Sequence, residues 1–286
     1  MGRVPAALSV DFEFFTHLPA YRGARGTTDA TDLGVEGVER LCDAFESAGA
    51  AGTWFTVGDI AEDYPSVLGR VADGGHEIAS HTHTHQHLSE LDAPDRRFEL
   101  VRSKERLEAA TGADVDGFRA PSFDLADDHF AELADAGYEY DSSVVPCRSI
   151  PGWYGGEFDT CRPSPATDVD PGAPPGFREV PVAVMPRLRL PLTGTWIRFF
   201  GVNYTLAGMY WLARRGVPPV LYVHPWELSD LPAVEGVPRR VYFRTGSYMR
   251  RAVERILDAD FEFVTVRSLA ENATSGASPR RAEVGR

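Results

Sequence analysis

The chain has 286 residues, of which 43% are hydrophobic and 11% aromatic, so it can bury a sizeable core and wholesale disorder is not expected. That length suits one large α/β domain or two small ones. A formal net charge of −13 argues against nucleic acid or an anionic membrane as the main partner.

The basic residues are almost all arginine, because Lys104 is the single lysine. An acidic surface with little lysine suits a halophilic protein, although a GC-rich genome would also favour arginine. Excess acid repels itself most strongly where salt is low. We therefore expect the melting temperature to rise between low and multimolar salt in thermal denaturation. An unchanged melting temperature would contradict a halophilic origin.

Strands and helices alternate through the first half of the chain. The apolar run "AALSVDF" predicts a buried strand that ends in acidic residues. Helices are predicted at 34–50, 59–75, 92–111 and 126–137, and further strands at 51–57, 76–80, 114–121 and 138–145. This alternation predicts a mostly parallel sheet wrapped by helices, either open or closed as a barrel.

A stretch rich in proline and glycine, at about 146–196, interrupts the pattern and fits turns and a short hairpin from residue 177 onward. The alternation then resumes with helices at 203–215 and 245–258 and strands at 218–224 and 261–266. Residues 272–286 are expected to be a disordered tail. The chain thus divides into a single domain, 1–271, with an insertion at 146–196, and the tail.

Cysteine usage and the N-terminus bear on the compartment. Three cysteines are too few for a disulfide scaffold, and thiols are the expected state of Cys147 and Cys161, although these two could pair. The first residues lack a long apolar segment, so no secretory signal or membrane span is predicted. A cytoplasmic location is the default expectation.

Residues able to carry chemistry follow several predicted strands: Asp11 with Glu13, the stretch "SHTHTHQHL" at 80–88, Arg119 and His224. In parallel α/β folds, ligand sites gather where strands end, so these side chains are expected to converge.

The histidine stretch allows two interpretations. On an exposed strand all four histidines would face one side, as a loose metal-binding tract. If the chain turns after residue 80, His81 and His85 stand one helical turn apart and can grip one ion. Two histidines with one nearby carboxylate would leave positions open for water and substrate, which is typical of a catalytic metal.

Five motifs occur in order: "LSVDFEFFTH", "GHEIASHTHTH", "GFRAPSF", "GYEYDSS" and "LYVH". Together they resemble the motifs of the polysaccharide deacetylases, the NodB-homology carbohydrate esterases. The last continues as "LYVHPWEL", close to a branch found in exopolysaccharide gene clusters. The resemblance implies a distorted (β/α) barrel of about seven strands and metal-dependent removal of N- or O-acetyl groups from sugars.

The resemblance also implies the metal ligands. His81 and His85 match the two histidine ligands of the family. The usual first motif has two adjacent aspartates, the second binding metal, whereas Phe12 stands there in this chain. Glu13 shares a strand face with Asp11 and is expected to be the third ligand; the alternative is an acid outside the metal's reach. One divalent ion is implied, with zinc expected and cobalt, manganese or nickel as alternatives.

The remaining roles carry over by position. Asp11 matches the catalytic base and Arg119 the arginine that holds its carboxylate. His224 resembles the general acid, and Asp141 the carboxylate that orients and charges it. In the arginine motif Ser122 replaces the usual tyrosine, and its backbone N–H is implied to lie in the oxyanion hole.

Other conspicuous residues have plainer interpretations. His83 and His87 are expected not to be ligands, and His17 fits a site wall and an ordinary loop equally well. His129 is expected to be exposed on its helix. Trp226 is expected to shape the pocket next to His224. Further along the chain from Asp141, Trp153 and Tyr154 could stack on a sugar, with loop packing the alternative.

Three functions are consistent with these residues. The first is a deacetylase of N-acetylated sugars of an envelope or exported glycan, or of a precursor, with a carbohydrate as its partner. The second is a ring-opening amidohydrolase similar to the allantoinase-like relatives, and the third a non-catalytic sugar- or metal-binding module. A cytoplasmic enzyme could associate with the membrane through a partner. The oligomeric state is left open, with a homodimer as one option.

Overall fold

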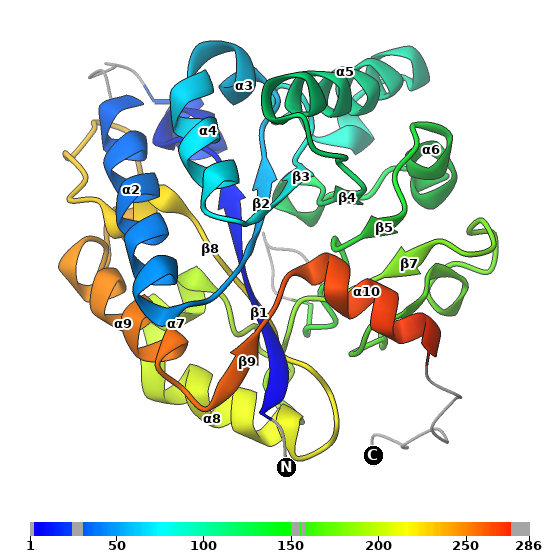
Figure 1. The fold of residues 1–286 in the computed structure, drawn as a ribbon. Helices are drawn as coiled ribbons and strands as arrows, with labels where there is room; N and C mark the ends of the chain where they lie inside the picture. The colour runs from blue at the N-terminus through cyan, green and yellow to red at the C-terminus, as the bar shows by residue number, and fades with distance from the viewer. Residues whose placement is uncertain (1–2, 25–30, 150–154, 156–157, 276–286) are drawn as a thin grey trace.

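The computed structural model describes residues 3–24, 31–149, 155 and 158–275, and a mostly parallel sheet forms its centre (Figure 1). Among these residues the strands are β1 (Val4–Phe12), β2 (Thr53–Thr56), β3 (Glu77–Ser80), β4 (Gly117–Phe118), β5 (Tyr140–Asp141), β6 (Ser164–Pro165), β7 (Arg178–Glu179), β8 (Val220–Val223) and β9 (Phe261–Phe263). Their order is β6-β7-β5-β4-β3-β2-β1-β8, and β9 pairs with the start of β1. Among the pairs formed by these described strands, β6–β7 alone is antiparallel.

The sheet curves into a distorted barrel. After β7 the backbone N–H of Val180 donates to the carbonyl of Asp141, and the N–H of Ala183 donates to the carbonyl of Val220 at 2.8 Å. Residues 180–183 therefore connect the β5 side of the sheet with β8. The predicted distorted (β/α) barrel is confirmed, with eight strands in the main order where about seven were expected.

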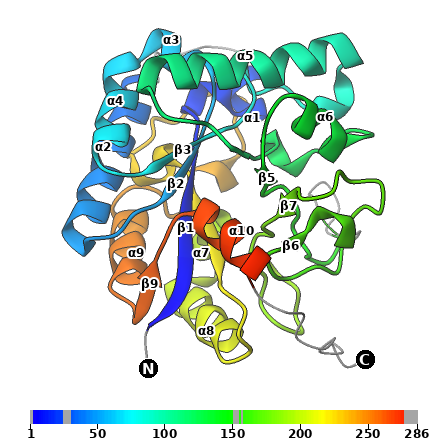
Figure 2. The same ribbon diagram turned by 45° about the vertical axis from the view of Figure 1, so that its right-hand side comes forward.

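Helices cover the outside of the sheet. They are α1 (Pro19–Arg22), α2 (Thr31–Ala48), α3 (Asp59–Asp63), α4 (Pro65–Asp73), α5 (Ala93–Thr111), α6 (His129–Asp135), α7 (Gly194–Phe200), α8 (Val202–Ala213), α9 (Ser247–Leu257) and α10 (Val266–Ser275). Figure 1 shows α2, α4 and α9 along one side, with α5 and α6 on the other. In the turned view of Figure 2, α10 lies in front of the lower part of the sheet.

The alternation of side chains along β1 places the functional residues. Leu8, Val10 and Phe12 pack outward in the main core against the helices, whereas Ala7 belongs to the smaller cluster inside the barrel, with Phe55 of β2. Because side chains alternate along a strand, Asp11 and Glu13 follow Ala7 to the inside. Phe12 thus fills the helix-facing core, which is why no ligand can stand there.

Several elements differ from those predicted. The helix expected at 59–75 is two helices, α3 and α4, because Pro65 disfavours helical geometry at Tyr64 and then begins the second helix. Helix α7 lies within and beyond the proline-rich stretch, where the composition gave no helical signal.

Regular elements lie both within the stretch 146–196 and at the predicted start of the tail. Strands β6 and β7 lie within 146–196, so this stretch contributes to the barrel wall. Helix α10 extends to Ser275, beyond the predicted start of the tail at 272, and residues 276–286 lie outside the described residues. None of the helices in the described part of the chain is long and apolar enough to span a membrane.

Candidate active site

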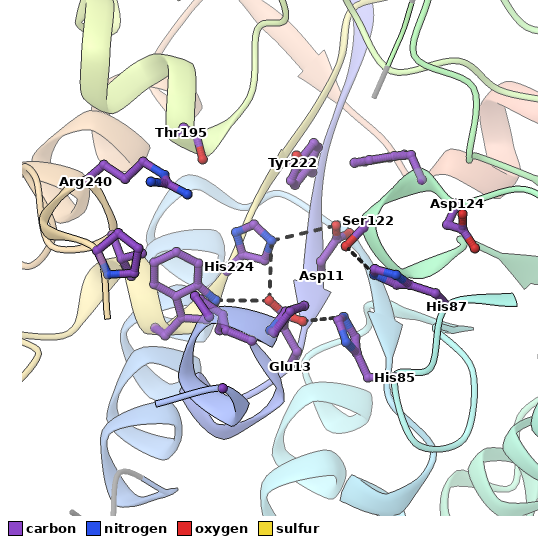
Figure 3. A pocket seen from close by; sticks show the side chains of 18 of the residues that line it. Asp11, Glu13, His85, His87, Ser122, Asp124, Thr195, Tyr222, His224 and Arg240 are labelled. Carbon is purple, nitrogen blue, oxygen red and sulfur yellow. Dashed lines mark hydrogen bonds and ion pairs between the residues drawn. The ribbon is translucent and has the colours of Figure 1, made fainter. Parts of the chain in front are cut away.

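A cavity of about 890 Å³ opens at the carboxyl ends of β1, β3, β4 and β8 (Figure 3). Its lining includes Asp11, Glu13, His81, His85 and His224, the side chains that the sequence predicted would converge. They come from segments far apart in the sequence, which the parallel sheet brings to one edge.

Three buried side chains bring their ligand atoms together: Glu13, His81 and His85. These atoms all lie within 4.8 Å of one another, and Nε2 of His85 is 2.5 Å from Oε2 of Glu13. Nδ1 of His81 lies 2.7 Å from the carbonyl oxygen of Arg119, which can only accept, so Nδ1 donates and Nε2 keeps its lone pair. Within the described residues, this is the group found able to hold one metal ion.

Burial and charge prepare these groups to bind a cation. Burial lowers the pKa of His81 to about 4, so its ring is neutral near neutral pH. Burial alone would raise the pKa of Glu13, but the charge and hydrogen bond of His85, together with His224 and His81, lower it well below its usual range. The group thus offers a neutral imidazole and an anionic carboxylate.

The histidine stretch turns after β3, and it does so without forming a helix. Thr82 and His85 both have positive φ, at 63° and 59°, a conformation that costs energy for a β-branched residue such as Thr82. Glu99 of α5 fixes the turn, because its Oε2 accepts the backbone N–H groups of His83 and Thr84, both at 2.8 Å. This turn brings the ring centroids of His81 and His85 to 5.1 Å.

A single arginine fixes the carboxylate of Asp11. The fully buried Arg119 places Nη1 2.6 Å from Oδ1 of Asp11 and 2.9 Å from the hydroxyl of Ser9. Its Nε and Nη2 donate to the carbonyl and hydroxyl oxygens of Ser142, and the ring of Phe55 lies 4.0 Å from its guanidinium carbon. The guanidinium is held on several sides, and it holds Asp11 in place.

His224 faces the metal-binding group from the other side of the cavity. Its Nε2 lies 3.6 Å from Oε1 of Glu13 and 4.0 Å from Oδ2 of Asp11 (Figure 3). Its Nδ1 lies 3.3 Å from Oε2 of Glu227, which also accepts the backbone N–H of His224. Burial opposes the charged ring, but the hydrogen bond and charge of Glu227, with Glu13 and Asp11, raise the pKa of His224.

Glu227 is paired in turn with Arg198 of α7. Nε of Arg198 and Oε1 of Glu227 lie 2.8 Å apart, and both side chains are buried. Burial opposes ionisation of Glu227, but the charge of Arg198, followed by the contacts with His224, lowers its pKa. A Cβ on Gly194 would lie 2.0 Å from Oε2 of Glu227, so the absence of a side chain there lets α7 approach.

The predicted partnership between Asp141 and His224 is wrong. Oδ2 of Asp141 lies 3.2 Å from Nε2 of His129, and its Oδ1 accepts from the hydroxyl of Ser143 at 2.6 Å. Strand parity is the reason: Tyr140 packs inside the barrel, so its neighbour Asp141 faces the outer helix α6. The carboxylate beside Nδ1 of His224 is instead that of Glu227, three residues further along the chain.

Ser122 and Trp226 both line the cavity. Ser122 has φ 54° and ψ 16°, and its hydroxyl lies 3.1 Å from Nε2 of His87. The indole Nε1 of Trp226 donates to Oε1 of Glu13 at 3.2 Å. Its ring stacks on His224, with centroids 5.0 Å apart.

The other histidines lie around the site. His17 is buried, with Nε2 3.3 Å from Asp59 and its ring 6.2 Å from that of His85. His83 packs on Phe98 instead of facing the cavity. His129, expected to be exposed, is buried against Asp141.

Two smaller expectations concern the loop at 146–161. Trp153 and Tyr154 lie outside the described residues. Cys147 and Cys161 are both thiols.

Comparison with known families assigns most of the chain. Residues 27–140 match the polysaccharide deacetylase model, as the motifs predicted. The chain carries a polysaccharide deacetylase domain. Residues 142–271 match a model described as a domain of unknown function, DUF3473. N-Acetylglucosamine deacetylases of this family are hydrolases that act on carbon–nitrogen bonds other than peptide bonds.

Curated relatives are similar to this chain over part of its length. The peptidoglycan deacetylase-like protein FGM2 of Gibberella zeae is 33% identical over 110 residues, which are 38% of this chain and 32% of the relative. A chitooligosaccharide deacetylase of Sinorhizobium fredii is 34% identical over 86 residues, 30% of this chain and 40% of the relative. The chain thus spans well under half the length of these relatives.

Solved structures share the fold over nearly the whole chain. A Mycobacterium smegmatis protein assigned as a polysaccharide deacetylase has a TM-score of 0.70 at 23% identity, covering 96% of this chain and 92% of that one. PuuE allantoinase has a TM-score of 0.66 at 15% identity, covering 96% and 91%. At these identities the similarity concerns the fold.

Proposed function

We propose that this chain is a metal-dependent deacetylase that hydrolyses the N-acetyl group of a sugar in an envelope or exported polysaccharide, or in a precursor of one. The observation that supports this most is a single cavity in which a three-donor group (Glu13, His81, His85) lies beside Asp11 and His224. Binding alone would need neither the arginine-held carboxylate nor the histidine, so the arrangement favours hydrolysis over a non-catalytic module.

The three donors suit a catalytic zinc ion. Two imidazoles and one carboxylate leave part of a tetrahedral coordination open, and the bond from His81 Nδ1 to a carbonyl fixes its ring as a ligand needs. Bound there, a divalent cation would polarise the acetyl carbonyl and lower the pKa of an attacking water. Zinc matches these donors best, with cobalt, manganese and nickel as alternatives.

Zinc binding provides a direct check of the three donors. Replacing His81 with alanine is expected to raise the Kd for zinc more than about 100-fold, measured by calorimetry at pH 7, because a third of the protein's donors is lost. The matched control is His83→Ala, which removes a neighbouring histidine that packs on Phe98, and the Kd should stay within about threefold. Equal losses in the two variants would contradict the assignment.

The other residues would handle protons and charge. Asp11, held by Arg119, accepts the proton of the attacking water. The backbone N–H of Ser122 donates to the oxyanion that forms on the acetyl group. His224 protonates the departing amine, with Glu227 and Arg198 orienting its ring.

The cavity needs both family segments and the strand before them. Asp11 and Glu13 precede residue 27, His81 and Arg119 lie within 27–140, and His224 lies within 142–271. We therefore regard residues 1–271 as one catalytic domain. The sequence "LYVHPWEL" resembles that of a branch found in exopolysaccharide gene clusters, and we propose that the chain belongs to this branch.

The test is acetate release from N-acetylglucosamine oligomers and nucleotide sugars, in multimolar salt with zinc. Release that requires His81 and Asp11 would support the proposal. Acetate release from none of these substrates, together with hydrolysis of allantoin, would favour the ring-opening amidohydrolase.

A further inference from the structure

One wall of the cavity carries a cation and an aromatic ring that the reaction does not use, and a second aromatic ring stacks on the first. Phe199 of helix α7 and Arg240, which follows β8 in the chain, both line the cavity. Phe243 stacks on Phe199, with centroids 5.5 Å apart and planes at 24°. We call Phe199, Arg240 and Phe243 the arginine–aromatic rim.

The side chains of the rim are exposed to solvent. Phe199 and Phe243 are 40% and 42% exposed, and adjoining exposed apolar side chains are typical of interaction sites. Figure 3 shows the side chain of Arg240 extending towards the cavity from the side of Thr195. Large apolar surfaces with a few polar groups at a cavity are typical of ligand sites.

Arg240 differs from the charged residues near it in the cavity lining, because their side chains have polar partners. Arg198 is neutralised by Glu227, and the carboxylate of Asp124 accepts the backbone N–H and hydroxyl of Ser89. Among the described residues, the guanidinium of Arg240 has no acidic partner and no hydrogen bond. In a chain with a net charge of −13, an arginine that lines the cavity and has no acidic partner in the described part of the chain is conspicuous.

The backbone of the rim is fixed to the catalytic residues. Nη1 of Arg198 donates to the carbonyls of Arg240, Val241 and Phe243, the strongest contact being 2.8 Å to Val241. Because the same arginine pairs with Glu227, which contacts His224, the rim keeps its position relative to the reacting atoms. A cavity of about 890 Å³ also approaches the upper limit for small-molecule sites, leaving space beyond a single sugar unit.

We propose that the arginine–aromatic rim binds a part of the substrate next to the N-acetyl sugar, and that this part carries an anionic group, a carboxylate or a phosphate. Arg240 would bind the anion through paired N–H donors, and Phe199 with Phe243 would contact an apolar sugar face. This inference rests on the proposed deacetylase function and narrows its substrate to anionic glycans or phosphorylated precursors.

The experiment compares three N-acetylglucosamine substrates at one salt concentration: the neutral tetramer, an oligomer alternating with glucuronate, and N-acetylglucosamine 1-phosphate. Arg240→Gln is expected to lower the ratio of kcat/KM for the preferred anionic substrate to that for the neutral one by about tenfold. The two anionic substrates distinguish a carboxylate from a phosphate.

The matched control is Arg239→Gln, which removes the same charge from an exposed neighbour that does not line the cavity. Its ratio should be that of the native chain. If the ratio of kcat/KM falls equally in both variants, the effect is one of net charge and the proposal is overturned. An unchanged ratio in Arg240→Gln would also overturn it.

Measurements of saccharide binding test this inference independently of the proposed function. If the native chain releases no acetate from any substrate, the deacetylase proposal fails, but calorimetry of the same saccharides with the native chain and Arg240→Gln still tests the rim. A Kd for an anionic saccharide about tenfold higher in Arg240→Gln supports the rim, and equal Kd values contradict it.

Discussion

Replacing Asp11 with asparagine is expected to lower kcat for acetate release by about 10²–10⁴-fold, the range for loss of a positioned general base. Asparagine has nearly the same shape, and its carbonyl oxygen can still accept from Arg119, which lies 2.6 Å from the native carboxylate. What is lost is the ability to take a proton from water. The measurement is acetate release at saturating substrate and zinc.

The matched control is Asp124→Asn, the same substitution at another carboxylate that lines the cavity. Asp124 is bonded to Ser89, away from the reacting groups, so kcat should fall less than about fivefold. An Asp11→Asn enzyme within tenfold of the native rate would contradict the assignment of the base. Unchanged melting temperatures in both variants would show that folding is not the cause.

Replacing His224 with glutamine is expected to lower kcat strongly for one kind of substrate and only weakly for another. The departing amine of an N-acetyl sugar needs a proton, so kcat should fall about 10²–10⁴-fold. An aryl acetate releases a phenolate, which is a stable leaving group and needs no proton, so kcat for this substrate should fall less than about tenfold. The measurement is kcat for both substrates in the native and variant enzymes.

The outcome distinguishes a general acid from a structural histidine. Equal losses of kcat on both substrates would show that His224 holds the site together without donating a proton.

Glu227→Gln should show the same difference between the two substrates with a smaller loss of kcat, because Glu227 acts through the orientation and charge of His224. Arg198→Lys should recover part of the activity lost in Arg198→Ala, because the cation beside Glu227 is kept.

Much of the fold and the metal-binding group could be predicted because they depend on local pattern. The alternation in "AALSVDF" predicts which side chains of β1 share a face, and this places Asp11 and Glu13 together on the inside. The segments that follow the strands then converge because parallel strands end at one edge of a sheet. Those two rules bring Glu13 to the edge of the sheet at which His81 and His85 lie.

The partner of His224 could not be predicted by position in a motif. Strand β5 is only two residues long, so its pattern does not show which side chain faces inward, and Asp141 turned outward to His129. Glu227 reaches His224 through the 3-10 turn Pro225–Leu228, in which residues three apart face each other. A histidine followed by proline and then, at the third position, by glutamate is the available local signal.

Arg198 and the rim depend on contacts that are distant in sequence. Helix α7 can approach Glu227 because Gly194 lacks a side chain, and nothing in the proline-rich stretch indicates that packing. The histidine turn is similar: the positive φ values of Thr82 and His85 are imposed by Glu99 of α5, not by local preference.

Titration of zinc into chelator-treated protein, followed by acetate release from an N-acetylglucosamine oligomer or its anionic counterpart, tests the central claim most directly. We predict that activity rises to a plateau at one equivalent of zinc in the native chain, and that His81→Ala stays inactive at the same concentrations. Full activity in the chelated protein, or equal activity in His81→Ala, would contradict a metal-dependent deacetylase centred on Glu13, His81 and His85.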